Sequence, residues 1–429
     1  MATTSQVAAA LFSPAGPETS LSSFTQPARR LPVFLVTERL SFFPLGRRDR
    51  AQIRKIEASV AEARRFLTAN EIERAQRPLV DCGLTYLMDC ARRRFCILLP
   101  QPEGPLVSKT KQFHRAYYYE EEDADYGREC ILAVQLLKGE AKKAWMVFHQ
   151  ETRALRKLHA MHIPNIPAYY GAITSLPGQC AILSELFSTD LCQWYAERMH
   201  QKSIETIPKS STFEILHILC DIIDGLEALH ERNLVHRDIK LENIVLQVTP
   251  GIKAALIDFE MMQEATQLAQ SGGTKEYLSP EALIRYMQKR SFIGLDLKAV
   301  DMWSFGVCLL IVISGGWASN QLHLFANELF ERQGIDAPTR FDQLMTHVTE
   351  TDPFVLVTQL MRRYIQDVVN DIQMYYAHGY LVEDPNYLSR EVLPLTERLL
   401  SINPKERPTA REAREVLHTA LANIPARSA

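Results

Sequence analysis

The spacing of apolar residues along the 429-residue chain changes from strand-like to helical. Residues 131–137 and 180–187 are apolar runs of strand length, and between them residues 145–158 have apolar side chains at helical spacing. After Ser188 the pattern is mostly helical, in segments 213–229, 302–313, 390–400 and 410–421. A small strand-rich part followed by a larger helical part predicts an α+β protein with two lobes, whose junction binds a ligand.

The first hundred residues have a different pattern. Residues 1–30 are rich in Ser, Thr and Ala without periodicity, which leaves an organelle transit peptide, a secretion leader and a disordered leader open. From residue 49, apolar residues recur at three- and four-residue steps among Arg and Glu. We therefore expect a helical extension over 31–99, with a solvated basic face and a possible surface for a protein partner.

A Pro-rich stretch at 100–105 marks the end of this extension. The main domain is then expected over 106–421, with the strand-rich lobe ending at about 188 and the helical lobe beginning at about 189. Residues 422–429 would form a short tail.

Composition argues against several classes of partner. With 46% apolar residues and a formal charge of −3, the chain is globular in character and unsuited to nucleic acid as a main partner. The apolar run at 305–313 is too short to span a bilayer, so we expect no membrane span. The eight cysteines lack metal-site or disulfide spacing. Free thiols favour a reducing compartment such as the cytoplasm, with organelle targeting or secretion as alternatives.

One stretch, VHRDIKLEN from Val235 to Asn243, holds an Asp that can take up a proton and an Asn that can bind a metal. It resembles the catalytic loop of protein kinases. Four more stretches resemble motifs of that family, in the same order: IDFE at 257–260, GTKEYLSPE at 273–281, DMWSFG at 301–306 and NPKERPT at 403–409. Residues 106–421 are thus similar to a eukaryotic-type Ser/Thr protein kinase, with a small antiparallel β-rich N-lobe and a larger α-helical C-lobe.

The resemblance implies a set of chemical roles. Asp238 would accept the proton of a Ser or Thr hydroxyl on a protein substrate, while ATP donates its γ-phosphate. Lys240 would neutralise charge on the transferred group. Asn243 and Asp258 supply hard oxygen ligands suited to Mg²⁺.

The resemblance also places the nucleotide. Backbone groups of Glu185 and Phe187 would contact adenine, and Val245 would lie under the base, although ordinary core packing also explains Val245. Glu151 occupies the ion-pair position of the regulatory helix, and Gln135 occupies the position of its lysine partner.

Other matched positions have structural roles. Arg407 would form a buried ion pair with Glu281, and Asp301 would hold the backbone of the catalytic loop. The remaining matches form a stacked apolar spine of His236, Phe259 and Leu155.

Three departures from the family pattern concern the nucleotide side. Gln135 has no charge, and a unit charge about 4 Å from a phosphate is worth roughly 4 kcal/mol, or on the order of a thousandfold in rate. Residues 113–118, where the family has a glycine-rich loop, contain no glycine. Glu260 replaces the last residue of the family's DFG; if that position requires a positive φ, the cost is about 1–2 kcal/mol.

Two hypotheses follow. The chain is an active, atypical Ser/Thr kinase in which another cation replaces the lysine, with Lys138, Lys142, Arg115 or Arg128 as candidates. Alternatively it is a pseudokinase that acts as a binding or allosteric scaffold. A small-molecule kinase on the same fold is a third possibility.

Regulation by an anion is also expected, because Arg237 lies beside Asp238. A phosphate on Thr266 or Ser271 could bind Arg237, or Glu264 could take its place permanently.

Overall fold

The computed structural model divides the chain into two units, and each contains several segments. The first unit comprises Met1–Leu84, Cys90–Cys96 and Tyr117–Ile131; the second comprises Thr85–Asp89, Ile97–Ala116 and Leu132–Ala429. The structure describes residues 85–89, 94–98, 106–107, 111–120, 130–137, 141–175, 179–199, 211–248, 251–313 and 385–424, with scattered helical residues within 58–78 and 362–370.

The N-terminal extension is only partly helical. Its described residues between 58 and 66 are helical and mostly exposed, in agreement with the amphipathic pattern. Residues 85–98 differ from the expected helical extension, because they contain two strands, β1 (Thr85–Asp89) and β2 (Arg94–Leu98). Both strands contain an aromatic residue and other strand-forming residues, which favour a sheet wherever one is available to pair with. Residues 1–30 and 100–105 lie outside the described part.

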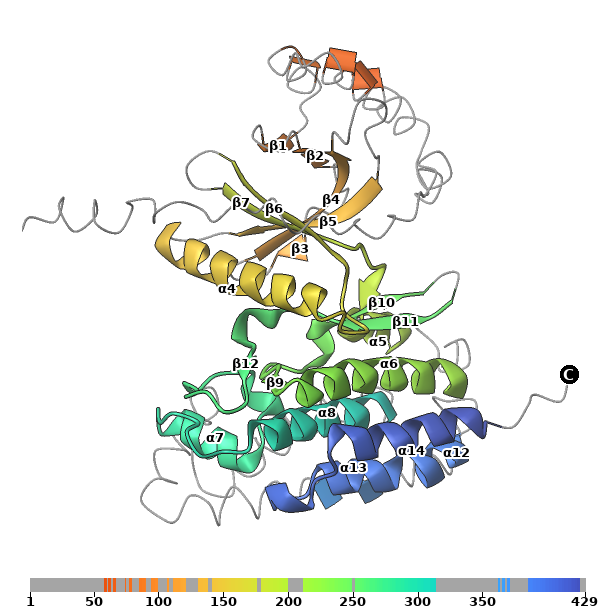
Figure 1. Ribbon diagram of the computed structural model, residues 1–429. Helices are drawn as coiled ribbons and strands as arrows, with labels where there is room; N and C mark the ends of the chain where they lie inside the picture. Colours follow the sequence, from red (N-terminus) through yellow and green to blue (C-terminus); the bar gives the residue numbers. More distant parts are fainter. Residues whose placement is uncertain are drawn as a thin grey trace, which may run out of the picture. The chain divides into compact units, whose positions relative to one another are not determined.

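Seven strands form one sheet in the order β1-β2-β4-β5-β7-β6, with β3 paired to β4 (Figure 1). The further strands are β3 (Leu106–Val107), β4 (Lys111–Glu120), β5 (Cys130–Leu137), β6 (Tyr169–Ser175) and β7 (Gln179–Ser184). The two apolar runs of the sequence thus become adjacent antiparallel strands, β5 and β7, with Gln135 opposite Ile182.

A single long helix, α4 (Ala141–Ala160), carries the helical pattern found between these strands. Its apolar side chains Phe148, Leu155 and Leu158 are buried in the same core cluster as Ile182 of β7. That cluster continues through the helical lobe as far as Ala420, so α4 and the helical lobe share one core.

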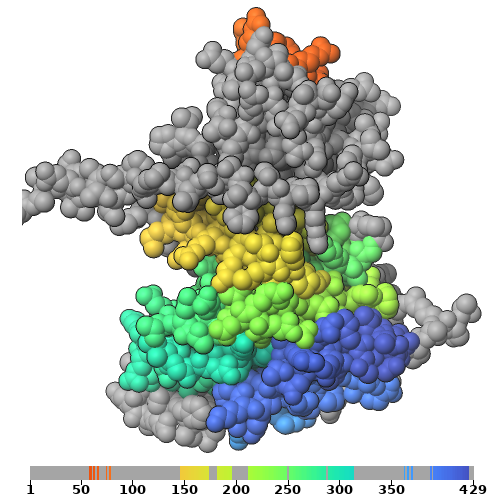
Figure 2. All heavy atoms as spheres, viewed as in Figure 1, coloured from red at the N-terminus to blue at the C-terminus, as the bar shows by residue number. Residues whose placement is uncertain are grey.

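The helical lobe is built around two largely buried helices, α6 (Thr212–Glu231) and α8 (Leu297–Ile313). In the described part of the lobe the other helices are α5 (Leu191–Met199), α7 (Pro280–Met287), α12 (Pro385–Glu391), α13 (Leu393–Leu399) and α14 (Ala410–Ala422). Capping boxes begin α6 at Ser211 and α14 at Thr409. In Figure 2 the side chains of α6 (green) meet those of α14 (blue). Arg414 of α14 binds Asp224 of α6 at 2.7 Å.

Short strands and 3₁₀ turns hold the loops between these helices. Two small antiparallel sheets have the strand orders β11-β10-β8 and β12-β9. The strands are β8 (Thr189–Asp190), β9 (Leu234–Val235), β10 (Ile244–Gln247), β11 (Lys253–Leu256) and β12 (Gln263–Glu264). The 3₁₀ turns are η6 (Leu241–Asn243), η7 (Phe259–Met261), η8 (Lys275–Tyr277) and η9 (Pro404–Glu406).

Two expectations from composition can be compared with the described residues. No helix among them has both the length and the apolar character needed to cross a bilayer. Cys192, Cys220 and Cys308 are free thiols, and burial raises the pKa of Cys220 to about 12. These thiols are therefore uncharged near neutral pH.

Gly306 allows α8 to pack closely against the end of α13. A Cβ at this position would lie 2.9 Å from Leu399 Cβ and 3.0 Å from Leu400 Cδ2. We expect Gly306→Ala to lower the free energy of unfolding by about 1–3 kcal/mol through overpacking, in excess of any gain in helix propensity. Denaturant unfolding measures the change, and Gly251→Ala is the control, since its Cβ would meet nothing within 4 Å. Equal stabilities for the two variants would contradict close packing at Gly306.

Candidate active site

A buried carboxylate on α8 fixes the backbone of the catalytic loop. Asp301 is 1% exposed and accepts hydrogen bonds from the backbone N–H groups of His236 and Arg237, each at 2.8 Å, and lies 3.0 Å from His230 Nε2. Arg237 has a φ of 72°, a conformation that a non-glycine residue adopts only when its surroundings enforce it. The predicted role of Asp301 is confirmed by these bonds.

The same helix also supports residues 273–281, the GTKEYLSPE motif. Ser304, one turn after Asp301, donates a hydrogen bond of 2.7 Å to the carbonyl of Tyr277. Tyr277 belongs to η8, which follows Thr274. One buried helix therefore holds both loops that border the predicted catalytic group.

The carboxylate of Asp238 is surrounded by donors. Lys240 Nζ donates to Oδ2 at 2.7 Å, Thr274 Oγ1 donates to Oδ1 at 2.7 Å, and Asn243 Nδ2 donates to Oδ2 at 3.0 Å. Lys240 Nζ also donates to Thr274 Oγ1 at 2.9 Å, which closes the network. Thr274 lies within the GTKEYLSPE motif, but sequence reasoning assigned it no contact with Asp238.

These donors set the protonation state of Asp238. Burial alone raises the pKa of this carboxyl, but the hydrogen bond and charge of Lys240 and the hydrogen bond from Thr274 outweigh it, so the pKa lies below its ordinary value. Asp238 is therefore an anion at neutral pH, in the state that can accept a proton.

Asp258 adopts the left-handed conformation, with φ 66° and ψ 67°. The next residue, Phe259, is 1% exposed, and its ring centroid lies 5.0 Å from that of His236. Glu260 follows in η7 and is not among the described residues with positive φ. The possible strain at Glu260 is thus not present: the positive φ belongs to Asp258, and Asp is a residue type that tolerates it better than most.

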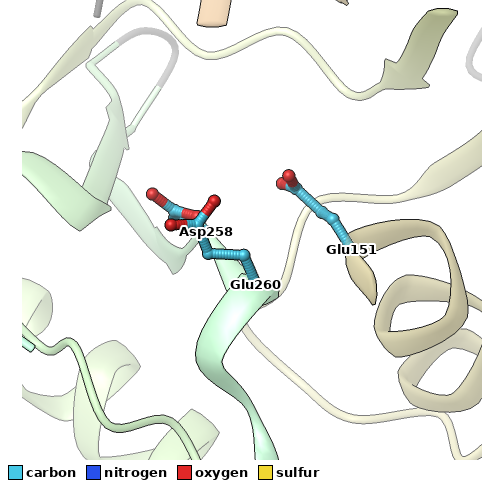
Figure 3. Close-up of side chains that lie close together, drawn as sticks. All are labelled: Glu151, Asp258 and Glu260. Atoms are coloured by element: carbon cyan, nitrogen blue, oxygen red, sulfur yellow. The ribbon is translucent and has the colours of Figure 1, made fainter. Parts of the chain in front are cut away.

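Three carboxylates lie together beside α4. Glu151 is 3% exposed and extends from α4 toward Asp258 and Glu260, and oxygen atoms of all three lie within 4.8 Å of one another (Figure 3). Sequence reasoning placed Glu151 and Asp258 here but gave Glu260 no part in the site. Glu151 is buried and Asp258 and Glu260 are half-buried, and three carboxylates this close together favour a cation between them.

Gln135, at the expected lysine position, lies on β5, which pairs with β7. Its side chain lies outside the described part of the chain, as do those of Lys138, Lys142, Arg115 and Arg128. The prediction of a relocated cation therefore remains a prediction.

The segment from 113 to 118 is not a loop. It lies inside the ten-residue strand β4, whose partner β3 pairs Leu106 with Phe113. The aromatic-rich sequence KQFHRAYYYE, which has no glycine, favours a regular strand. The expected location of a phosphate-covering loop is thus corrected: these residues form part of the sheet.

The segment between β7 and β8 is held in place by Glu185. Its backbone N–H donates to Ala168 O at 2.9 Å, and its carboxylate accepts from Ala168 N at 3.1 Å and Lys253 Nζ at 3.2 Å. Phe187 is buried, with Lys253 Nζ 5.4 Å from its ring centroid, and Val245 is half-buried on β10. Sequence reasoning missed the structural role of the Glu185 carboxylate.

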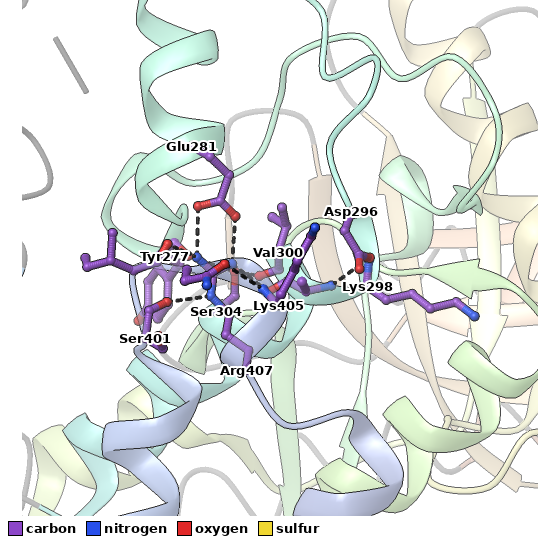
Figure 4. Close-up of polar contacts among 12 residues, drawn as sticks. Tyr277, Glu281, Asp296, Lys298, Val300, Ser304, Ser401, Lys405 and Arg407 are labelled. Atoms are coloured by element: carbon purple, nitrogen blue, oxygen red, sulfur yellow. Dashed lines mark hydrogen bonds and ion pairs between the residues drawn. The ribbon is translucent and has the colours of Figure 1, made fainter. Parts of the chain in front are cut away.

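Arg407 and Glu281 form the predicted buried ion pair. Arg407 NH1 and NH2 donate to the two carboxylate oxygens of Glu281 at 2.6 and 2.9 Å (Figure 4). Arg407 Nε donates to Ser401 O at 2.8 Å, NH1 donates to Ala299 O at 3.1 Å, and the guanidinium lies 5.0 Å from the Trp303 ring centroid. The pair joins the start of α7 to the segment before α14.

The fold and this site define a protein kinase. Residues 124–419 match the family model "Protein kinase domain", and the chain belongs to that family.

Curated relatives agree with this assignment. The chain is 32% identical over 194 residues to the meiosis-specific serine/threonine-protein kinase mek1 of Schizosaccharomyces pombe, an alignment that covers 43% of this chain and 39% of that protein. It is 28% identical over 213 residues to the serine/threonine-protein kinase Kist of Rattus norvegicus, covering 44% of this chain and 48% of Kist. In both alignments the chain spans less than half of the relative.

Proposed function

We propose that this chain is a Ser/Thr protein kinase that transfers the γ-phosphate of ATP to a hydroxyl group of a protein substrate. The observation that carries the proposal is the network around Asp238, in which Lys240, Thr274 and Asn243 orient an ionised carboxylate. Phosphoryl transfer depends mainly on positioning and charge compensation, and this network supplies both on the acceptor side.

The proton follows a simple path. Asp238 accepts the proton of the substrate hydroxyl as the hydroxyl oxygen bonds to phosphorus and the bond to the leaving diphosphate breaks. Lys240, 2.7 Å from Asp238, places a positive charge beside the transferred group. The position of this lysine, two residues after Asp238, is similar to the pattern of Ser/Thr kinases rather than that of tyrosine kinases.

The residues present fit a divalent metal. Asn243 uses its Nδ2 for Asp238, so its Oδ1 remains as an oxygen ligand. Asp258 adds a carboxylate, and the adjacent Glu151 and Glu260 make the surroundings strongly anionic. Hard oxygen donors of this kind suit Mg²⁺, which would be held by Asn243 and Asp258. When bound, the ion would neutralise charge on the phosphates of ATP.

The adenine would bind at the segment between β7 and β8. Glu185 already commits its backbone N–H and its carboxylate to protein partners, so its carbonyl is the group we assign to adenine, together with the backbone of Phe187. Val245 would lie under the base.

The second candidate is a pseudokinase scaffold. It is favoured by Gln135 in place of a lysine and by the strand at 113–118 in place of a phosphate-binding loop. Partners would then bind the lobes or the 31–99 extension.

Two assays separate the candidates. Incubation with radiolabelled ATP and generic Ser/Thr substrates, in Mg²⁺ or Mn²⁺, should show transfer above that of the Asp238→Ala variant. A thermal-shift titration should show stabilisation by Mg-ATP that Asp258→Ala abolishes, because a ligand of the native state raises Tm. A thermal shift with Mg-ATP but without phosphate transfer would favour the pseudokinase. If both the thermal shift and the transfer were absent, ATP would be rejected as a ligand.

The lowered pKa of Asp238 predicts a particular pH dependence. A depressed pKa keeps the base ionised until the pH falls below about 4, so kcat/KM should show no acid-side loss due to Asp238 between pH 5 and 8. Lys240→Met removes the hydrogen bond and the charge that lower this pKa. The pH below which kcat/KM falls, the acid limb of the profile, should therefore move to a higher value. Thr274→Val should move it in the same direction. Identical acid limbs in all three proteins would contradict the assignment.

A further inference from the structure

Arg237 is half-buried, and its guanidinium is surrounded by neutral groups. Its NH1 donates to Gln263 Oε1 at 2.7 Å, its NH2 donates to the carbonyl of Gln270, and the guanidinium lies 5.8 Å from the Phe292 ring centroid. Burial lowers the pKa of Arg237, and the Asp301 carboxylate raises it. Asp301, however, is bonded to the backbone of Arg237 and not to its guanidinium. The guanidinium therefore has no anionic hydrogen-bond partner among the described residues.

Two of the residues expected to serve Arg237, Glu264 and Thr266, make other contacts in the described part of the chain. Glu264 Oε1 binds Lys157 of α4 at 3.1 Å, so it does not serve Arg237. Thr266 is exposed and accepts a hydrogen bond of 3.4 Å from Asn233. The side chain that meets Arg237 is a glutamine, which can bind the guanidinium without any modification.

Gln263 is well placed to organise the segment that follows it. It pairs with Val235 in the β9–β12 sheet, and its Nε2 donates to Glu264 O at 3.3 Å and Gln267 O at 3.2 Å. Its amide thus binds Arg237 through the oxygen and folds residues 264–267 through the nitrogen.

The contact continues to the catalytic base. Gly273 has a φ of 106°, and a Cβ there would lie 2.9 Å from the carbonyl oxygen of Arg237, so the two backbones are in close approach. Thr274 follows and donates to Asp238. The position of Arg237 therefore determines where Thr274 meets the base.

We propose that Gln263 is a positioning residue that holds residues 263–278 in their catalytic arrangement through Arg237, without phosphorylation of Thr266 or Ser271. The inference deepens the proposed kinase function and rests on it for its catalytic consequence. Its structural part, the ordering of residues 263–278, is independent of activity.

The test compares three variants of the full chain. Gln263→Leu removes the acceptor at similar size, Gln263→Glu retains the acceptor, and Gln270→Leu is the matched control, because Gln270 contributes only its carbonyl oxygen. Hydrogen–deuterium exchange of residues 263–278 is measured without nucleotide. Loss of a hydrogen bond to a charged group should speed exchange about ten- to a hundredfold in Gln263→Leu. Gln270→Leu should remain close to the unaltered chain. Gln263→Glu keeps the acceptor for Arg237 but loses the Nε2 bonds to Glu264 O and Gln267 O, so its exchange should rise only within residues 264–267 and stay close to the unaltered chain over 268–278.

Steady-state kinetics and phosphatase treatment complete the test. Gln263→Leu should lower kcat by about tenfold or more with little change in the KM for ATP, and Gln263→Glu should restore kcat. Phosphatase treatment of the unaltered chain should change neither exchange nor kcat. Loss of activity and protection on phosphatase treatment, or normal exchange in Gln263→Leu, would overturn the proposal. If Gln263→Leu exchanged faster than the unaltered chain but neither protein transferred phosphate, the structural role of Gln263 would stand and only the kinase function would be rejected.

Discussion

Asp238→Asn is expected to lower kcat by about 10²–10⁴-fold, because an amide of the same shape cannot accept the proton of the substrate hydroxyl. The amide oxygen can still accept a hydrogen bond from Lys240, which lies 2.7 Å from Oδ2 in the unaltered chain. The fold and nucleotide binding should therefore be retained. Phosphate transfer measured at saturating ATP reports the loss, and the Mg-ATP thermal shift reports that binding persists.

Asp296→Asn provides the matched control for this change. Asp296 is exposed, and its carboxylate accepts hydrogen bonds from Lys298 N and Ala299 N at the start of α8, a capping role that Asn also fulfils. Its kcat should equal that of the unaltered chain. If Asp238→Asn retained full activity, the base would have to be another group and the proposed mechanism would be wrong.

Arg407→Ala is expected to lower the free energy of unfolding by about 3–5 kcal/mol, because it leaves Glu281 without its partner in a mostly buried position. The side chain of Arg407 is 0% exposed and that of Glu281 is 12% exposed. Ser401 O and Ala299 O would also lose their donor. Equilibrium unfolding in guanidinium chloride measures the change.

Two controls identify the cause of this loss. Arg411→Ala removes an arginine whose side chain is 76% exposed and which lies 3.6 Å from Glu415, so its effect should stay within about 1 kcal/mol. The double variant Glu281→Leu with Arg407→Met removes both charges and should lose less than Arg407→Ala. An Arg407→Ala loss no larger than that of Arg411→Ala would show that the pair contributes little.

The elements that sequence analysis predicted well have local signals. The apolar spacing of 145–158 identified α4, and the acid at Glu214 three residues after Ser211 is the signal that begins α6. The roles of Asp301 and of the Arg407–Glu281 pair were predicted from the resemblance of DMWSFG, GTKEYLSPE and NPKERPT to protein-kinase motifs.

The features that sequence analysis missed depend on contacts between distant segments. Strand β1 was included in a helical extension, because whether a short aromatic run becomes a strand depends on a partner that lies elsewhere in the chain. The positive φ at Asp258, the third carboxylate from Glu260 and the contact of Gln263 with Arg237 likewise follow from tertiary packing. A pattern of residue types does not contain that information.

The two bonds that α8 makes through Asp301 and Ser304 have a mechanical consequence. These residues lie three positions apart on one rigid, buried helix, and they hold the catalytic loop and the carbonyl of Tyr277 respectively. Because both loops are bonded to the same helix, a displacement of α8 would carry both of them with it. The distance between Asp238 and the segment that would align the substrate would therefore be preserved when the helix moves.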